Sequence, residues 1–161
     1  MSAAASSNLQ TLGVLLERAE AQRDEAQRQL LDVQQRAAAA RNQHAQLNQY
    51  RGDYQQRWSQ QFARQATMDI VGCYKSFGDR LDQAIDSQGH VAQHAEQRVE
   101  RARENLRELE MRVAAIRKLI ERRSLEAQRK AQRQEQKAVD EQAARAALAG
   151  FGNNPFVRLS A

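Results

Sequence analysis

The sequence predicts an all-α protein, a long antiparallel two-helix coiled-coil hairpin. Three observations predict it: a helix-forming composition, an unbroken apolar seam in the first part of the chain, and a second seam after a short break. The 161 residues include one Pro, seven Gly and only 5% aromatic residues, and they are rich in Ala, Gln, Arg and Glu. This composition is typical of long helices and not of a sheet-containing enzyme domain.

The first helix is expected over about residues 8–62. Ser7 and Gln10 have the spacing of a capping box at its start. Steps averaging 3.5 residues keep one stripe of a helix facing a partner helix. All members but Arg23, His44 and Arg51 are apolar or aromatic, and the polar His44 is interpreted as fixing the register. The seam consists of Leu12, Leu16, Ala19, Arg23, Ala26, Leu30, Val33, Ala37, Ala40, His44, Leu47, Arg51, Tyr54 and Trp58.

A turn is expected over about residues 63–70, with Thr67 or Asp69 as the N-cap of a second helix over about residues 71–148. A step of four residues on each side of Ala95 predicts a local stutter before Val99. The second seam consists of Tyr74, Phe77, Leu81, Ala84, Gln88, Val91, Ala95, Val99, Ala102, Leu106, Leu109, Val113, Ile116 and Ile120.

Residues 1–148 are therefore interpreted as a single helical hairpin, and residues 149–161 as a flexible tail after the helix stops near Gly150. A single continuous rod that dimerises is the structural alternative. Folding the hairpin near residue 65 places Tyr54 opposite Phe77, Leu47 opposite Ala84, Leu30 opposite Arg101 and Leu12 opposite Leu119. Residues 121–148 then lack a partner within the chain, and we expect them to become ordered against another protein.

The formal net charge of +5 is concentrated in residues 117–137. A basic block of this kind is either a solvated helix face or a docking surface for an acidic partner. It contains no aromatic side chain for base stacking and has Glu and Gln interleaved throughout, which disfavours a nucleic-acid partner. Its basic residues are Arg117, Lys118, Arg122, Arg123, Arg129, Lys130, Arg133 and Lys137.

No residue pattern resembles an active site, so we expect no enzymatic activity and no cofactor. His90 and His94 have the i, i+4 spacing of metal ligands, but no further ligand is placed beside them, and we interpret them as solvated. The lone Cys73 is interpreted as a packing residue. No secretion signal and no apolar run long enough to cross a membrane is present, so we expect a cytosolic protein without direct membrane insertion.

Aromatic residues cluster at the expected turn end of the hairpin. Only some of them lie on a seam, and Tyr50, one helical turn before Tyr54, is expected to point outward. Exposed aromatic side chains on a polar helical surface are typical contact anchors. The cluster consists of Tyr50, Tyr54, Trp58, Tyr74 and Phe77.

The spacing of residues at this end resembles the FliJ family, small coiled-coil proteins of the bacterial flagellar type III export apparatus. The resemblance covers residues 9–148 and rests on a spaced motif. One departure is Gln88, where the family has His. The motif residues are Gln43, Leu47, Tyr50, Tyr54, Phe77, Leu81 and Ala84.

The resemblance implies a non-enzymatic stalk that inserts the end bearing its termini into the hexameric export ATPase ring and promotes the assembly and activity of that ring. The motif residues are expected to contact the cytoplasmic domain of the export-gate membrane protein, and export chaperones are a further candidate partner. We expect Arg122, Arg123, Arg129 and Arg133 to contact the ring. The protein is expected to be a cytoplasmic monomer, held at the inner membrane by the export apparatus. The alternatives are the equivalent stalk of a virulence injectisome and an unrelated coiled-coil scaffold.

Overall fold

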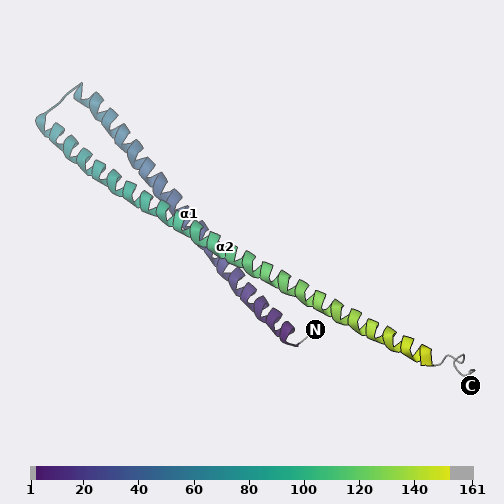
Figure 1. Ribbon diagram of the computed structural model, residues 1–161. Helices are drawn as coiled ribbons and strands as arrows, with labels where there is room; N and C mark the ends of the chain where they lie inside the picture. The colour runs from purple at the N-terminus through teal and green to yellow at the C-terminus, as the bar shows by residue number, and fades with distance from the viewer. Residues whose placement is uncertain (1–2, 153–161) are drawn as a thin grey trace, which may run out of the picture. The chain divides into compact units, whose positions relative to one another are not determined.

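The protein is an all-helical hairpin. The computed structural model describes the backbone of residues 3–152 and the side chains of residues 7–150. Helix α1 spans Ala3–Phe62 and helix α2 spans Met68–Gly152. The two long helices pack against each other and are joined by residues 63–67 (Figure 1). The predicted fold class is confirmed.

The helix ends differ from the sequence expectation at three points. Helix α1 begins at Ala3, so Ser7 lies inside the helix, where its carbonyl accepts the Thr11 hydroxyl at 3.0 Å; the predicted capping box is wrong. Residues 3–5 are all Ala, the residue with the highest helix propensity, and they favour this extension. Helix α2 begins directly after Thr67, an N-cap position. It continues to Gly152, and residues 153–161 of the expected tail lie outside the described residues.

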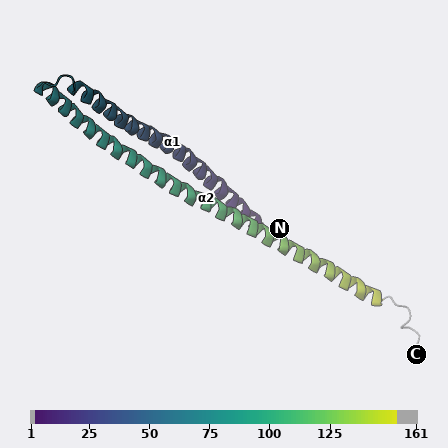
Figure 2. The same cartoon turned by 90° about the horizontal axis from the view of Figure 1, so that it is seen from above.

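The chain divides into two units. Unit 1 comprises Met1–Arg18 and Val113–Ala161, and unit 2 comprises Ala19–Arg112. Each unit contains parts of both helices, so each has its own stretch of helix pairing. In unit 2, α1 and α2 lie side by side up to the connection between them (Figure 2).

The seam of α1 agrees at every position with the sequence prediction. Each of the predicted seam residues is buried or half-buried, and Phe62 extends the seam by one further step. The most deeply buried members are small, so the helix backbones approach each other closely along a narrow core. These members are Ala19, Ala26, Ala37 and Ala40.

The seam of α2 differs from the prediction at three positions. Phe77 and Val91 are 41% and 50% exposed, and Ala84 is exposed; the adjacent Gly78, Ile85 and Ala92 face α1 instead. The corrected seam runs in alternating steps of three and four residues, so the stutter predicted before Val99 is wrong. Two successive four-residue steps occur later, from Ile116 through Ile120 to Ser124. The corrected seam consists of Tyr74, Gly78, Leu81, Ile85, Gln88, Ala92, Ala95, Val99, Ala102, Leu106, Leu109, Val113, Ile116 and Ile120.

In unit 2 the predicted pairing of Tyr54 with Phe77 is confirmed, whereas Ala84 and Arg101, which were placed opposite Leu47 and Leu30, are exposed. The ring centroids of Tyr54 and Phe77 are 4.7 Å apart. The amide of Gln88 donates to Oε1 of Gln43 at 3.3 Å and to the carbonyl of Ala40 at 3.5 Å. A further cross-helix ion pair joins Arg41 to Glu96.

Polar residues in the α1 seam sit opposite glycines of α2. A Cβ atom built on Gly89 would lie 3.3 Å from Nε2 of His44, and one built on Gly78 would lie 3.6 Å from Nη2 of Arg51. A Cβ atom at Gly89 would be tight against His44, whereas one at Gly78 would make an ordinary van der Waals contact with Arg51. His44 and Arg51 fix the register by shape as well as by polarity.

Candidate functional site

Six aromatic side chains form a cluster beside the connection between the helices, here called the aromatic cluster: Tyr50, Tyr54, Trp58, Phe62, Tyr74 and Phe77. The Tyr54 ring lies at its centre, 5.3 Å from Tyr74 and 6.0 Å from Trp58 between ring centroids. Phe62, which the sequence analysis did not include, lies 5.5 Å from Trp58 and 5.2 Å from Tyr74. Phe62 could have been found from the sequence, because it lies four residues after Trp58 and continues the α1 seam. Aromatic pairs at these distances stabilise this end of unit 2 by more than the burial of their surface area alone provides.

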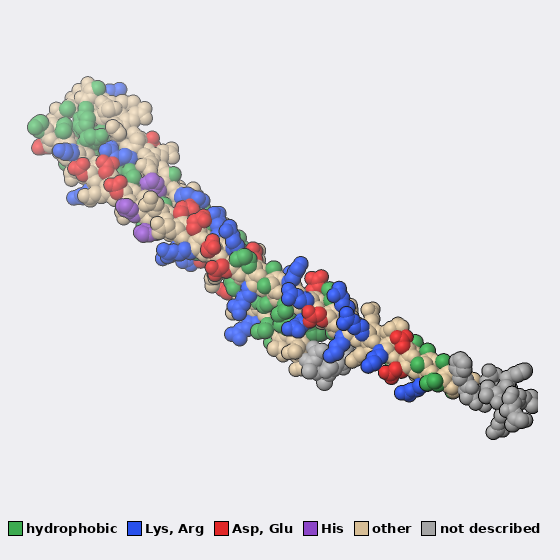
Figure 3. All heavy atoms as spheres, in the orientation of Figure 1, with side chains coloured by type: hydrophobic (Ala, Val, Ile, Leu, Met, Phe, Trp, Pro, Cys, Tyr) green, Lys and Arg blue, Asp and Glu red, His purple; other side chains and the backbone are tan. Residues whose placement is uncertain are grey.

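The cluster combines a packed centre with exposed edges. Tyr50 is 51% exposed while its ring stacks on Tyr54 at 6.5 Å, as expected for a residue beside the seam. Burial raises the pKa of the Tyr54 phenol, and the neighbouring Tyr74 and Tyr50 raise it further. Hydrophobic side chains gather on the surface at this end of unit 2 (Figure 3). The cluster therefore offers a partner apolar surface held by a rigid centre.

An ion pair joins the two helices next to the aromatic cluster. Nε of Arg51 donates to Oδ1 of Asp82 at 2.6 Å, and Nη2 donates to Oδ2 at 3.2 Å. The hydrogen bonds from Arg51 hold the pKa of the Asp82 carboxyl below its ordinary value of 3.8. The pKa of Arg51 is raised in turn by Asp82 and, to a smaller extent, by the phenol of Tyr74. The bidentate geometry joins α1 to α2 next to Tyr54.

The motif residues divide into exposed and packed ones. Gln43, Tyr50, Phe77 and Ala84 are exposed, whereas Leu47 and Tyr54 are half-buried in the α1 seam. Leu81 is only 7% exposed and offers a partner almost no surface. The amide of Gln88 is used within the chain, because it donates to Oε1 of Gln43.

The basic residues of α2 in unit 1 form a second candidate surface, here called the basic surface: Arg122, Arg123, Arg129 and Arg133. All four are exposed. Arg123 pairs with Glu126 at 3.6 Å, whereas Arg122, Arg129 and Arg133 have no ion pair with any residue that the structure describes. Lys and Arg side chains are frequent on this stretch (Figure 3).

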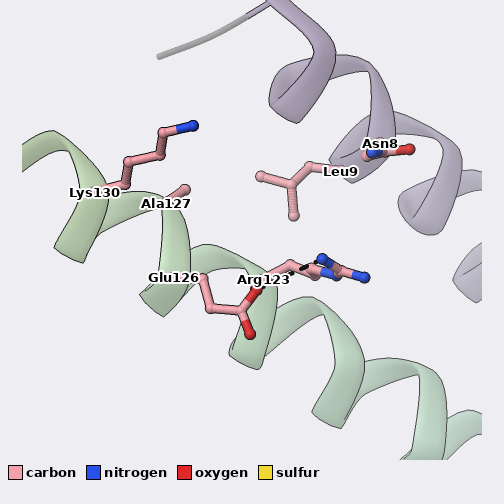
Figure 4. A pocket seen from close by; sticks show the side chains of 6 residues that line it. All are labelled: Asn8, Leu9, Arg123, Glu126, Ala127 and Lys130. Atoms are coloured by element: carbon pink, nitrogen blue, oxygen red, sulfur yellow. Dashed lines mark ion pairs between the residues drawn. The ribbon is translucent and has the colours of Figure 1, made fainter.

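Helix α1 covers α2 further along than the sequence predicted. Leu9 points toward α2, where Arg123, Glu126, Ala127 and Lys130 line the facing side of a small pocket (Figure 4). Ser124, Ala127 and Ala131 are still half-buried. The expected loss of pairing after Ile120 is therefore wrong, because Leu9 faces residues of α2 beyond Ile120.

From residue 132 to residue 150, every side chain of α2 is exposed. We call these residues the uncovered segment. It is held as a helix by local interactions, such as the bond from the Gln136 amide to Asp140 at 3.0 Å. A helical segment that packs against no other part of its own chain is suited to bind another molecule.

Other chemistry has little support within the described residues. No group of three or more His, Cys, Asp and Glu side chains among them could hold a metal ion, and His90 and His94 are both exposed. Cys73 is an exposed free thiol, and not the packing residue that the sequence suggested. None of the helices in the described residues has the length and hydrophobicity to cross a membrane.

The sequence matches the family described as "Flagellar FliJ protein" over residues 8–150. No match was found among the curated proteins or among the solved structures. The family match covers both candidate surfaces. The chain therefore belongs to the FliJ family, and it is a non-catalytic component of the flagellar export apparatus.

Proposed function

We propose that this protein is the stalk of the flagellar export apparatus and links two partners. The basic surface and the uncovered segment bind inside the ring of the hexameric export ATPase and promote its assembly and activity. The aromatic cluster binds the cytoplasmic domain of the export-gate membrane protein. In this role the protein works in the cytoplasm and is held at the inner membrane through the gate, and export chaperones are a further candidate partner.

One observation carries this proposal: α2 continues through residues 132–150 with every side chain exposed. An isolated polar helix is only marginally stable in water, so contacts with another protein would stabilise such a segment strongly. Side chains at the mouth of a ring would surround a helix on all sides, which matches a segment that has no preferred apolar face.

The basic surface supports the same partner by charge. Arg122, Arg129 and Arg133 are exposed and have no ion pair with a described residue, so they are available to acidic groups. Exposed charges mainly raise the rate of association and fix the register of the complex, and both effects weaken as salt screens the charges.

The aromatic cluster supports the gate contact. Tyr50 and Phe77 present exposed ring surface while contacts with Tyr54 hold both rings in place. Rigid aromatic side chains bind with little loss of conformational entropy and are frequent among residues that dominate binding energy. Leu81 lies below this surface in the core, and we propose that it supports the contact without touching the gate.

The experiment mixes the purified full chain with the cognate export ATPase and measures ATP hydrolysis and ring assembly. The test variant reverses Arg122, Arg129 and Arg133 to Glu. The control variant reverses Arg98, Arg101 and Arg112, which are exposed residues of α2 in unit 2 without a described ion pair. We expect the test variant to lose most of the stimulation, more so at low salt, and the control to keep it. Equal loss in both variants would show that only total charge matters and would contradict the assigned surface.

The virulence injectisome and the unrelated scaffold receive no support from the comparisons, because the matched family is flagellar.

A further inference from the structure

The first turns of α2 have a second face on which only Phe77 contacts α1, through the ring of Tyr54. A groove runs along this face, lined by Asp69, Gly72, Cys73, Ser76, Phe77 and Arg80, with Met68 beside its start. We call it the tip groove. The α2 seam in the same turns uses Tyr74, Gly78 and Leu81, which lie on a different side of the helix. Helix α1 therefore does not cover the groove.

The tip groove has an apolar wall and opposite charges at its two ends. Phe77 is 41% exposed and Met68 is 89% exposed. Asp69 lies at one end and Arg80 at the other, and neither has an ion pair or a side-chain hydrogen bond with any residue that the structure describes. A helix that fills the groove must therefore supply a cation near Asp69 and an anion near Arg80.

We infer that the tip groove binds the tip groove of a second copy of this chain. Apart from Met68, whose counterpart would be the buried Leu81, the lining is arranged symmetrically about the midpoint between Tyr74 and Lys75. A twofold-related copy with α2 running antiparallel therefore places its Arg80 opposite Asp69 and its Asp69 opposite Arg80. The same operation places Phe77 opposite Gly72 and Ser76 opposite Cys73. The groove thus meets the self-complementarity that a twofold interface requires.

The packing at the centre is favourable as well. Gly72 has no side chain, so the Phe77 ring of the other copy can pack over it, while the small Cys73 and Ser76 side chains face each other and let the two helices approach closely. Each α2 starts in the groove and then continues away from the other copy, so α1 of neither copy lies in the way. Because only the first turns of α2 are involved, the interface is small and the association is weak, as is usual for contacts below the standard interface size.

A charge-exchange experiment on the full chain tests this arrangement. Sedimentation equilibrium over a rising concentration series measures self-association of the wild type, D69R and R80D. Each single variant places two like charges opposite each other at both ends of the groove, so each alone should associate at least about tenfold more weakly. An equimolar mixture of D69R and R80D restores both opposite-charge pairs. We expect the mixture to associate about as strongly as the wild type.

The mixture also controls for folding, since a variant that fails to fold cannot be rescued by mixing with another. K75D serves as the matched control, because Lys75 is exposed in the same turns but does not line the groove, and it should associate like the wild type. Cys73 is the single cysteine of the chain, so a short bismaleimide that links two copies must join Cys73 to Cys73. We expect this product in the wild type and little of it in D69R alone.

Two results would overturn the inference: a wild-type chain that stays monomeric at every concentration, or a mixture of D69R and R80D no better associated than either variant alone. If the proposed gate contact is also correct, self-association and gate binding exclude each other, because both use Phe77. That consequence rests on the proposed function, whereas the sedimentation experiment does not involve the gate.

Discussion

The first and the last turns of α2 are held as helix in different ways. In the first turns, Tyr74 lies among the rings of Tyr54, Trp58 and Phe62, and Leu81 is buried against α1. In the uncovered segment, residues 132–150, no side chain is buried. Tertiary packing stabilises the first region, whereas intrinsic propensity and local side-chain pairs maintain the second. Regular helix in this protein therefore does not indicate a packed core.

The largest expected effect comes from removing the uncovered segment. A chain ending after Ala131 should keep its melting temperature, because the removed side chains bury nothing, but it should lose stimulation of the export ATPase. Circular dichroism and phosphate release measure the two properties.

A chain ending after Ile120 is the matched comparison. It also lacks Ala127 and the other residues that face Leu9, so its melting temperature should fall. If both truncations destabilise equally, residues 132–150 contribute to the core after all.

A large effect on stability is expected in the packed region. Leu81→Ala removes a side chain that is 7% exposed and should cost about 2–4 kcal/mol in the free energy of unfolding. Val91→Ala is the control, because Val91 is 50% exposed and its truncation should cost less than about 0.5 kcal/mol. Urea unfolding measures both values. A larger cost at Val91 would restore the seam that the sequence predicted.

The exposed edge of the aromatic cluster should separate binding from stability. Tyr50→Ala removes a ring that is 51% exposed and stacks on Tyr54, so it should cost at most about 1 kcal/mol of stability. Affinity for the cytoplasmic domain of the gate protein should fall about tenfold or more, as for an anchor residue, while ATPase stimulation is unchanged. Tyr50→Phe keeps the ring and should bind nearly normally. Normal gate binding by Tyr50→Ala, measured by calorimetry, would contradict the assigned surface.

The smallest expected effect concerns acid. The pKa of Asp82 is lower in the folded protein than its ordinary value of 3.8, so the folded state binds a proton at this carboxyl less readily. Its stabilising contribution is present above that value and is lost as the pH falls through the lowered pKa. The melting temperature of Asp82→Asn should therefore fall less steeply with acid below about pH 4 than that of the wild type. Asp79→Asn, at a carboxylate without a described ion pair, should follow the wild type.

The helical hairpin, the α1 seam and the pairing of Tyr54 with Phe77 could be predicted from the sequence. Every predicted α1 seam position is buried or half-buried, because residues at steps of three and four lie on one side of a helix. The aromatic cluster could be predicted for the same reason, apart from Phe62. The spaced motif from Gln43 to Ala84 also pointed to the family that the comparison found.

Only the tertiary structure decided which side of α2 faces α1. At Phe77 and Gly78, Ala84 and Ile85, and Val91 and Ala92, two adjacent residues are each compatible with the seam, and adjacent residues differ by only about 100° around a helix. The partner helix decides between them: Gly78 faces Arg51 of α1, and the adjacent Phe77 is 41% exposed. The packing of the two helices likewise decided how far α2 is covered, because Leu9 lies against Ala127 and its neighbours, beyond the predicted limit at Ile120. Both outcomes depend on side chains that are far apart in the sequence, and a pattern within one helix does not contain them.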